Sequence, residues 1–216
     1  MIEQQTAPVF FPPWVTRGAG FISVLFHPLF IGAMMAAYLL FIHPSYFIGF
    51  SDRARLMKLL IVINNNVFFP LVVVGLLRGL GFNKSFLLKT QKERIVPYIA
   101  SITFFFWSYY VFKNQTGTPE VMVGMCRGMF LSAAASLLLN NYFKISMHAV
   151  GIGGLLGLVT VSILDGSQYA GIPVLVALFL SGITITSRKI VSDHSWFDLI
   201  SGLLVGFLFQ LISLWI

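Results

Sequence analysis

The sequence predicts an all-α fold, a polytopic bundle of six to seven transmembrane helices. Of its 216 residues 57% are apolar and 10% are charged, and the mean hydropathy is +0.88. A soluble domain is about one quarter charged. Backbone groups inside lipid must hydrogen-bond within their own segment, so each apolar stretch is expected to be helical. The length suits one integral membrane domain, residues 1–216, with little mass outside the bilayer.

Seven apolar stretches can be counted as spans. They cover roughly residues 20–42, 57–80, 95–112, 121–143, 147–164, 169–186 and 196–216. Turn-forming sequences separate several of them, such as His43-Pro44-Ser45, residues 113–119 and Asp165-Gly166-Ser167. Residues 1–19 hold aromatic side chains and two prolines ahead of the first span, and we expect this segment to lie at the membrane interface.

The densest polar clusters fall on one side of the membrane when crossings are counted. They follow spans 2, 4 and 6, at residues 89–94, 144–148 and 187–198. Three clusters on one face can build one site. That face carries nine of the 14 lysines and arginines, which would favour the cytoplasm. Several of the nine are candidate phosphate ligands, however, so their number is a weak guide to orientation.

The third cluster contains the most specific pattern, in which Ser187 and Arg188 are followed after five residues by His194 and after three more by Asp198. If Asp193 or Ser192 caps the last helix, His194 and Asp198 lie one turn apart on the same face. A carboxylate there would hold the imidazole in one tautomer and stabilise its cation. A helix N-terminus would keep the ring neutral, with a lone pair for nucleophilic attack on phosphorus.

The other two clusters supply the remaining candidate groups. Ser146 is expected to cap the fifth span, and His148 is the only other histidine near a span start on this face. Phosphoryl transfer needs a proton for the leaving oxygen, which makes His148 a candidate general acid. In the first cluster, Lys89 and Arg94 can neutralise phosphate charge, and Lys92 is an alternative to Lys89.

Small and polar residues inside the spans predict close helix contacts. Gly153 and Gly157 in the fifth span, and Gly202 and Gly206 in the seventh, have the spacing that lets helix backbones approach. The two histidines would then lie near one end of this pair. Residues 64–66, three consecutive asparagines in the second span, are expected to form interhelical hydrogen bonds or a local break. His27 is interpreted as structural.

These clusters, in this order, resemble the motifs of the type 2 phosphatidic acid phosphatase superfamily of membrane lipid phosphatases. The family's third motif, S-R, five residues, H, three residues, D, is complete at residues 187–198. Its second motif, P-S-G-H, keeps only Ser146 and His148. Its first motif, K, six residues, R-P, has its nearest match in Lys89, Arg94 and Pro97 with altered spacing. The resemblance covers residues 85–216.

The resemblance implies a metal-independent lipid phosphatase without a cofactor that forms a phosphohistidine on His194. It implies that His148 protonates the leaving group, with Asp198 supporting His194. The phosphate would be held by five residues: Lys89, Arg94, Ser146, Ser187 and Arg188. Substrates would be phosphatidate, phosphatidylglycerophosphate or undecaprenyl pyrophosphate, and the site would face the periplasm or outer leaflet of a bacterial inner membrane.

Two other functions are compatible with the sequence. One is a transporter of an anion or a phosphorylated lipid, which would hold polar groups near the bilayer midplane. The other is a non-catalytic binder of lipid headgroups. The net charge of +7 favours anionic lipids or phosphate over nucleic acid as partners, because no basic run lies on a soluble domain.

Overall fold

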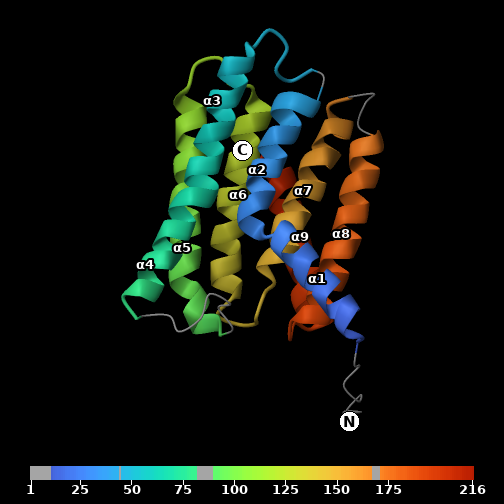
Figure 1. Ribbon diagram of the computed structural model, residues 1–216. Coiled ribbons are helices and arrows are strands. Elements are labelled where there is room, and N and C mark those ends of the chain that lie inside the picture. Colours follow the sequence, from blue (N-terminus) through green and yellow to red (C-terminus); the bar gives the residue numbers. More distant parts are fainter. Residues whose placement is uncertain (1–10, 44, 82–89, 167–170) are drawn as a thin grey trace.

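The computed structural model describes residues 11–43, 45–81, 90–166 and 171–216, and within these ranges it is all-helical, with no strand (Figure 1). The α-helices are α1 (Pro13–Leu25), α2 (Pro28–Ala37), α3 (Asp52–Ile63), α4 (Phe69–Gly79), α5 (Gln91–Asn114), α6 (Glu120–Leu139), α7 (Met147–Leu164), α8 (Gly171–Val191) and α9 (Trp196–Ile212). Two short π-helices, η1 (Tyr38–Ile42) and η2 (Asn64–Phe68), continue α2 and join α3 to α4. The all-α fold is therefore as expected.

The described residues contain five or six candidate spans, against the six to seven expected from the sequence. In the described residues, five helices are long and apolar enough to cross a membrane: residues 52–79, α5, α6, α7 and α8. The pair formed by residues 13–25 and 28–42 would be a sixth, but it is bent by 58°. Helix α9 is apolar but has 17 residues, about 25 Å of helix against a hydrocarbon core of about 30 Å.

The bend in the first span has a local cause. Pro28 lies at the first position of α2 and has no backbone N–H, so the helix cannot continue through it from α1. His27 is the N-cap, and its Nδ1 accepts a hydrogen bond from the backbone N–H of Leu29 at 3.4 Å. As a result α1 and α2 take different directions, and α1 lies against α8.

The second span shows both features expected of its asparagines. Residues 64–68 form the π-helix η2, a local irregularity of the hydrogen-bond pattern. The side chain of Asn66 is fully buried and accepts a hydrogen bond of 2.8 Å from the hydroxyl of Ser108 on α5. Its amide nitrogen lies 3.9 Å from the sulfur of Met129 on α6. Asn66 therefore links three helices inside the bundle.

Glycines bring α7 and α9 into backbone contact, as their spacing predicts. A Cβ at Gly157 would lie 2.9 Å from the carbonyl oxygen of Phe207, and one at Gly202 would lie 2.9 Å from that of Ser146. Gly153 and Gly206 approach the opposite backbone still more closely. No larger residue fits at these four positions without moving a helix, so the glycines fix the two starts, Met147 and Trp196, next to each other.

The polar clusters meet at one end of the bundle. Figure 1 shows the end of α6, the start of α7, the end of α8 and the start of α9 at the same end, together with the start of α5. The prediction that the three polar clusters lie on one side is therefore confirmed for their described residues. Helix α8 runs through Val191, five residues beyond its expected end, so Ser187 and Arg188 lie in its last turns rather than in a loop.

Candidate active site

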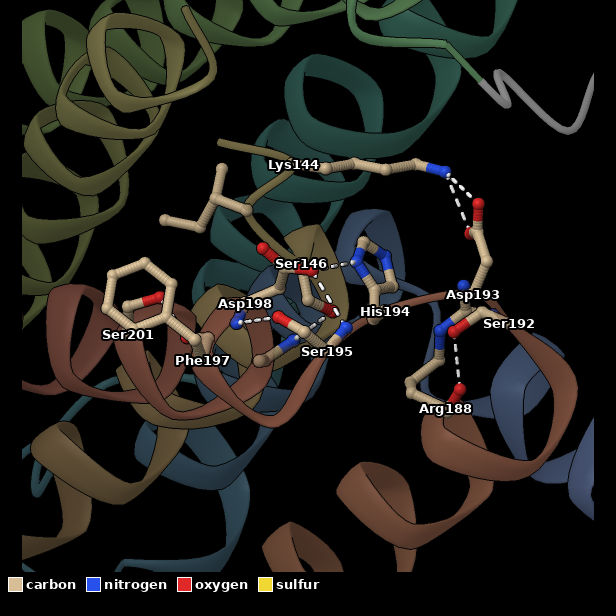
Figure 2. Close-up of polar contacts among 12 residues, drawn as sticks. Lys144, Ser146, Arg188, Ser192, Asp193, His194, Ser195, Phe197, Asp198 and Ser201 are labelled. Atoms are coloured by element: carbon tan, nitrogen blue, oxygen red, sulfur yellow. Dashed lines mark hydrogen bonds and ion pairs between the residues drawn. The ribbon is translucent and has the colours of Figure 1, made fainter. Parts of the chain in front are cut away.

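Three segments that are distant in sequence are joined by hydrogen bonds at this end of the bundle. Lys144 forms an ion pair of 2.6 Å with Asp193, which Figure 2 shows at the edge of the site. The guanidinium of Arg94 donates to the carbonyl oxygen of Ile145 at 3.1 Å. The backbone N–H of Ser146 donates to the carbonyl oxygen of Asp198 at 3.2 Å. These bonds hold α5, the start of α7 and the start of α9 in one constellation.

His194 lies in the short connection between α8 and α9 and is 3% exposed. The expected cap of α9 is corrected, because neither Asp193 nor Ser192 caps it. Ser195 does: its hydroxyl accepts a bond of 3.1 Å from the backbone N–H of Asp198. His194 therefore precedes the helix instead of standing in its first turn, and Asp198 is the third residue of the helix.

Asp198 was expected to hold the imidazole of His194 in one tautomer, but its hydrogen bond is to the backbone at the start of α9. Its Oδ2 accepts a hydrogen bond of 2.8 Å from the backbone N–H of Ser195, which completes a capping box. The same oxygen lies 3.7 Å from Nδ1 of His194, toward which it points in Figure 2. This is an ion-pair distance beyond hydrogen-bond length. Nδ1 has no hydrogen-bond partner among the described residues.

The surroundings of His194 favour a neutral imidazole. Burial and, after it, the positive charges of Arg94 and Arg188 lower the pKa of His194 to about 4. Asp198 acts in the opposite direction and offsets part of this effect. A neutral ring was expected from the dipole of α9, whereas here desolvation and two guanidinium groups are the main causes. At neutral pH His194 holds a lone pair.

Arg188 is half-buried in the last turn of α8, and its Nε is enclosed without a hydrogen-bond partner among the described residues. Its positive charge is close enough to interact with Arg94 and His194. Enclosing one N–H of a guanidinium without an acceptor costs free energy, which an anion at this point would offset. Ser187, 4% exposed on the preceding position of α8, faces the interior.

The first cluster is only partly described. Arg94 is 7% exposed near the start of α5, which begins with a capping box between Thr90 and Glu93. Lys89 lies outside the described residues. Lys92, the alternative to Lys89, is exposed. The site therefore includes Arg94, and the choice between the two lysines stays a prediction.

Both candidate residues of the second cluster, Ser146 and His148, lie at the start of α7. Ser146 is fully buried, and its hydroxyl caps α7 by accepting from the N–H of Ala149 at 3.4 Å, as expected. His148 lies in the first turn of α7, within electrostatic range of His194. Its Nε2 is 3.0 Å from the carbonyl oxygen of Ser23 on α1. A carbonyl only accepts, so Nε2 carries the proton and Nδ1 is left for other chemistry.

The structure adds one residue that the sequence interpretation had assigned a structural role only. His27, at the bend between α1 and α2, packs edge-on against His148 with ring centroids 5.3 Å apart. Together with the carbonyl of Ser23, it makes the first span one wall of the site. A signal was available in the sequence: a histidine followed by proline inside an otherwise apolar stretch. Its spatial partner was not.

The arrangement offers a neutral nucleophile, a second imidazole with a fixed tautomer, and two guanidinium groups at the membrane end of a bundle. No group of three or more His, Cys, Asp or Glu that could hold a metal ion is found in the described ranges. Comparisons of the chain with protein-family models, curated proteins and solved structures give no match.

Proposed function

We propose that this chain is a membrane phosphatase that hydrolyses a phosphomonoester or pyrophosphate on a lipid through a phosphohistidine at His194. The supporting observation is the position of His194, a buried neutral imidazole beside the guanidinium groups of Arg94 and Arg188. Phosphoryl transfer is catalysed mainly by positioning the nucleophile and by neutralising charge on the transferred group.

In the proposed first step, Nε2 of His194 attacks phosphorus and the bond from phosphorus to the lipid oxygen breaks. Nδ1 faces Asp198 and keeps its proton, so the phosphorylated ring is a cation that the carboxylate stabilises. The negative charge of the bound phosphate favours a second proton on His148, at Nδ1. The ring gives this proton to the leaving oxygen, while its Nε2–H remains bonded to Ser23. The products of this step are the lipid alcohol and the phosphorylated enzyme.

In the second step, water attacks phosphorus and the bond to Nε2 of His194 breaks. His148, now neutral, accepts a proton from the water through Nδ1, which restores both imidazoles and releases inorganic phosphate. Arg94 and Arg188 hold the equatorial oxygens in both steps. Ser187, and Lys89 from the segment before α5, are proposed as further phosphate ligands.

A lipid substrate is favoured over a soluble one by the location of these groups. The site lies at the end of a bundle whose outer surface is apolar, and the chain has little described mass outside it. A headgroup at the interface therefore reaches His194 while its chain stays among apolar side chains. Phosphatidate, phosphatidylglycerophosphate and undecaprenyl pyrophosphate are the proposed candidates, with the site on the periplasmic or outer face.

The test is phosphate release by detergent-purified protein from each of the three lipids, in the presence of a chelator. We expect release by the wild type, none by His194→Ala, and an acid-labile phosphorylated protein in a rapid quench. His43→Asn, at the opposite end of the bundle, is the matched control for loss of a histidine and should retain release. Binding of these lipids without turnover by the folded wild type would instead indicate a non-catalytic headgroup binder.

A further inference from the structure

A cavity inside the bundle begins next to the candidate site. It encloses about 600 Å³ of empty space, its open part included, and is lined by α2, α5, α6, α7 and α9. Pro28, Tyr98 and Met147 belong to its lining. Pro28 follows His27, Met147 precedes His148, and Tyr98 lies one turn beyond Arg94 on α5. One end of the cavity therefore adjoins the groups proposed to hold the phosphate.

The cavity extends about 10 Å from that end toward the middle of the bundle. Its lining covers seven residue steps on each of four helices: residues 28–35, 98–105, 129–136 and 147–154. Seven steps of an α-helix rise about 10 Å. An extended alkyl chain of about eight carbon atoms has this length.

The wall is apolar although it contains serines. The hydroxyl of Ser132 donates to the carbonyl of Met129 at 3.1 Å, and that of Ser136 donates to the carbonyl of Ser132 at 2.7 Å. The protons of these two hydroxyls are therefore directed into their own helix, and Ser101 on α5 is the remaining serine of the wall. Three of the other lining residues are methionines, whose flexible side chains adapt to the shape of an apolar occupant.

Two polar atoms mark the ends of the apolar wall. The hydroxyl of Tyr98, near Arg94, is buried and has no partner among the described residues. The Oε1 of Gln210, which lines the cavity from α9, is likewise buried without a described partner. A chain pressed against an unpartnered oxygen loses free energy, so Gln210 limits the apolar section. Tyr98 can donate to a substrate oxygen next to the phosphate.

We propose that this cavity binds the apolar chain of the phosphorylated substrate over its first eight or so carbons, with Tyr98 on the oxygen that joins chain and phosphate. The inference rests on the proposed function for the identity of the headgroup. Among the proposed substrates it favours the one with a single apolar chain on the phosphate, undecaprenyl pyrophosphate, over the two with a glycerol backbone and two chains, and it places that chain inside the bundle instead of on its outer surface.

The experiment measures binding of ethyl, hexyl, octyl and dodecyl phosphate to the full chain in detergent, in a His194→Ala background that prevents turnover. Affinity should rise up to octyl phosphate and then level off. Ala133→Leu fills the cavity and should lower the octyl-to-ethyl affinity ratio about tenfold, because a buried methylene changes Kd by about fourfold. Detergent takes up each ligand equally for all variants, so ratios between variants are comparable.

Ala134→Leu is the matched control, since the neighbouring alanine on α6 is outside the lining and the change in size is the same. Its ratio should equal that of the parent protein. Met35→Ala, which enlarges the far end, should move the plateau to longer chains even if Ala133→Leu fails to fold. Equal ratios for Ala133→Leu and Ala134→Leu, or an unmoved plateau in Met35→Ala, would overturn the inference.

The same ligands separate this inference from the proposed function. Chain-dependent binding that responds to Ala133→Leu, without phosphate release by the wild type, would support the cavity and refute the phosphatase. Release that requires His194 but is indifferent to the cavity variants would support the phosphatase and refute the cavity.

Discussion

The two ends of the helix bundle hold buried positive charges in different ways. At the end away from the site, Lys58 donates to Gln115 at 2.6 Å and to Thr118 at 3.0 Å. Arg127 pairs with Glu120 at 3.1 Å and donates to the carbonyl oxygen of Ser213. Both residues are less than 10% exposed, and their charged groups have hydrogen-bond acceptors within the protein.

At the site end the positive groups face one another. Arg94 and Arg188 interact with each other and with His194, and the Nε of Arg188 has no acceptor among the described residues. The nearest carboxylates are engaged, Asp193 with Lys144 and Asp198 with its own helix cap. The difference supports the proposal that the site end binds the phosphate of a substrate, whereas the charges of the other end are bonded within the protein.

The largest expected effect comes from replacing one arginine at each end of the bundle with methionine. Arg188→Met should lower the rate of phosphate release by about a hundredfold, the usual cost of removing one charge-stabilising donor, with little loss of stability. Arg127→Met should leave activity unchanged but lower the free energy of unfolding by about 2 kcal/mol, because it removes charged hydrogen bonds. Phosphate release and chemical denaturation measure the two effects. If Arg188→Met proves destabilising and active, the comparison fails.

The carboxylates provide the next test. Asp198→Asn keeps an acceptor for the N–H of Ser195, so the cap of α9 survives, but the negative charge 3.7 Å from His194 is lost. Release should fall about tenfold, since the cation formed after attack loses its stabilisation. Asp165→Asn at the other end, where Asp165 accepts from Tyr46 at 2.9 Å, should show no such loss. Equal activities of the two variants would argue against a role for Asp198 in catalysis.

A smaller effect separates the two roles of His27. Asparagine is a favoured N-cap residue, so His27→Asn preserves the cap of α2. The same change removes the ring that packs on His148. His27→Ala removes both. We expect both variants to lose about threefold in kcat, and only His27→Ala to lose about 1 kcal/mol of stability. If His27→Asn matches the wild type in kcat, the histidine acts only as a cap.

The sequence was sufficient for the features that depend on local patterns. The spacing of Gly153, Gly157, Gly202 and Gly206 predicts the contact of α7 with α9, because small residues one turn apart line one helix face. The counting of apolar segments predicts that the clusters share one end. Both predictions use only the spacing of residues and the lengths of apolar segments, which can be read directly from the sequence.

What the sequence could not provide depends on contacts between distant segments. The cap of α9 is an exception, because the capping box between Ser195 and Asp198 is a local pattern that the sequence contained. The structural role expected for His27 is confirmed by its cap of α2, but nothing in the sequence indicated its contact with His148, more than a hundred residues away. The count of seven spans included residues 196–216 as one apolar stretch, whereas α9 covers 17 of these residues and packs on α7 and α6.

The smallest predicted effect concerns the acid limb of the pH profile of kcat/KM, the range in which activity falls as the pH decreases. A neutral His194 is required, so kcat/KM should fall as the pH decreases through the pKa of about 4. Lys144 helps to lower this pKa, and its bond with Asp193 lowers the pKa of that carboxyl. Lys144→Gln removes one positive charge and releases a carboxylate near the ring. Both changes favour the imidazolium.

The limb should therefore move to higher pH by a few tenths of a unit in Lys144→Gln, as expected for an exposed ion pair worth less than about 1 kcal/mol. In Asp198→Asn it should move to lower pH, because Asp198 raises the pKa of His194. Lys113→Gln, at the opposite end, is the control and should leave the limb in place. Shifts of the same sign in Lys144→Gln and Asp198→Asn would show that the limb reports a group other than His194.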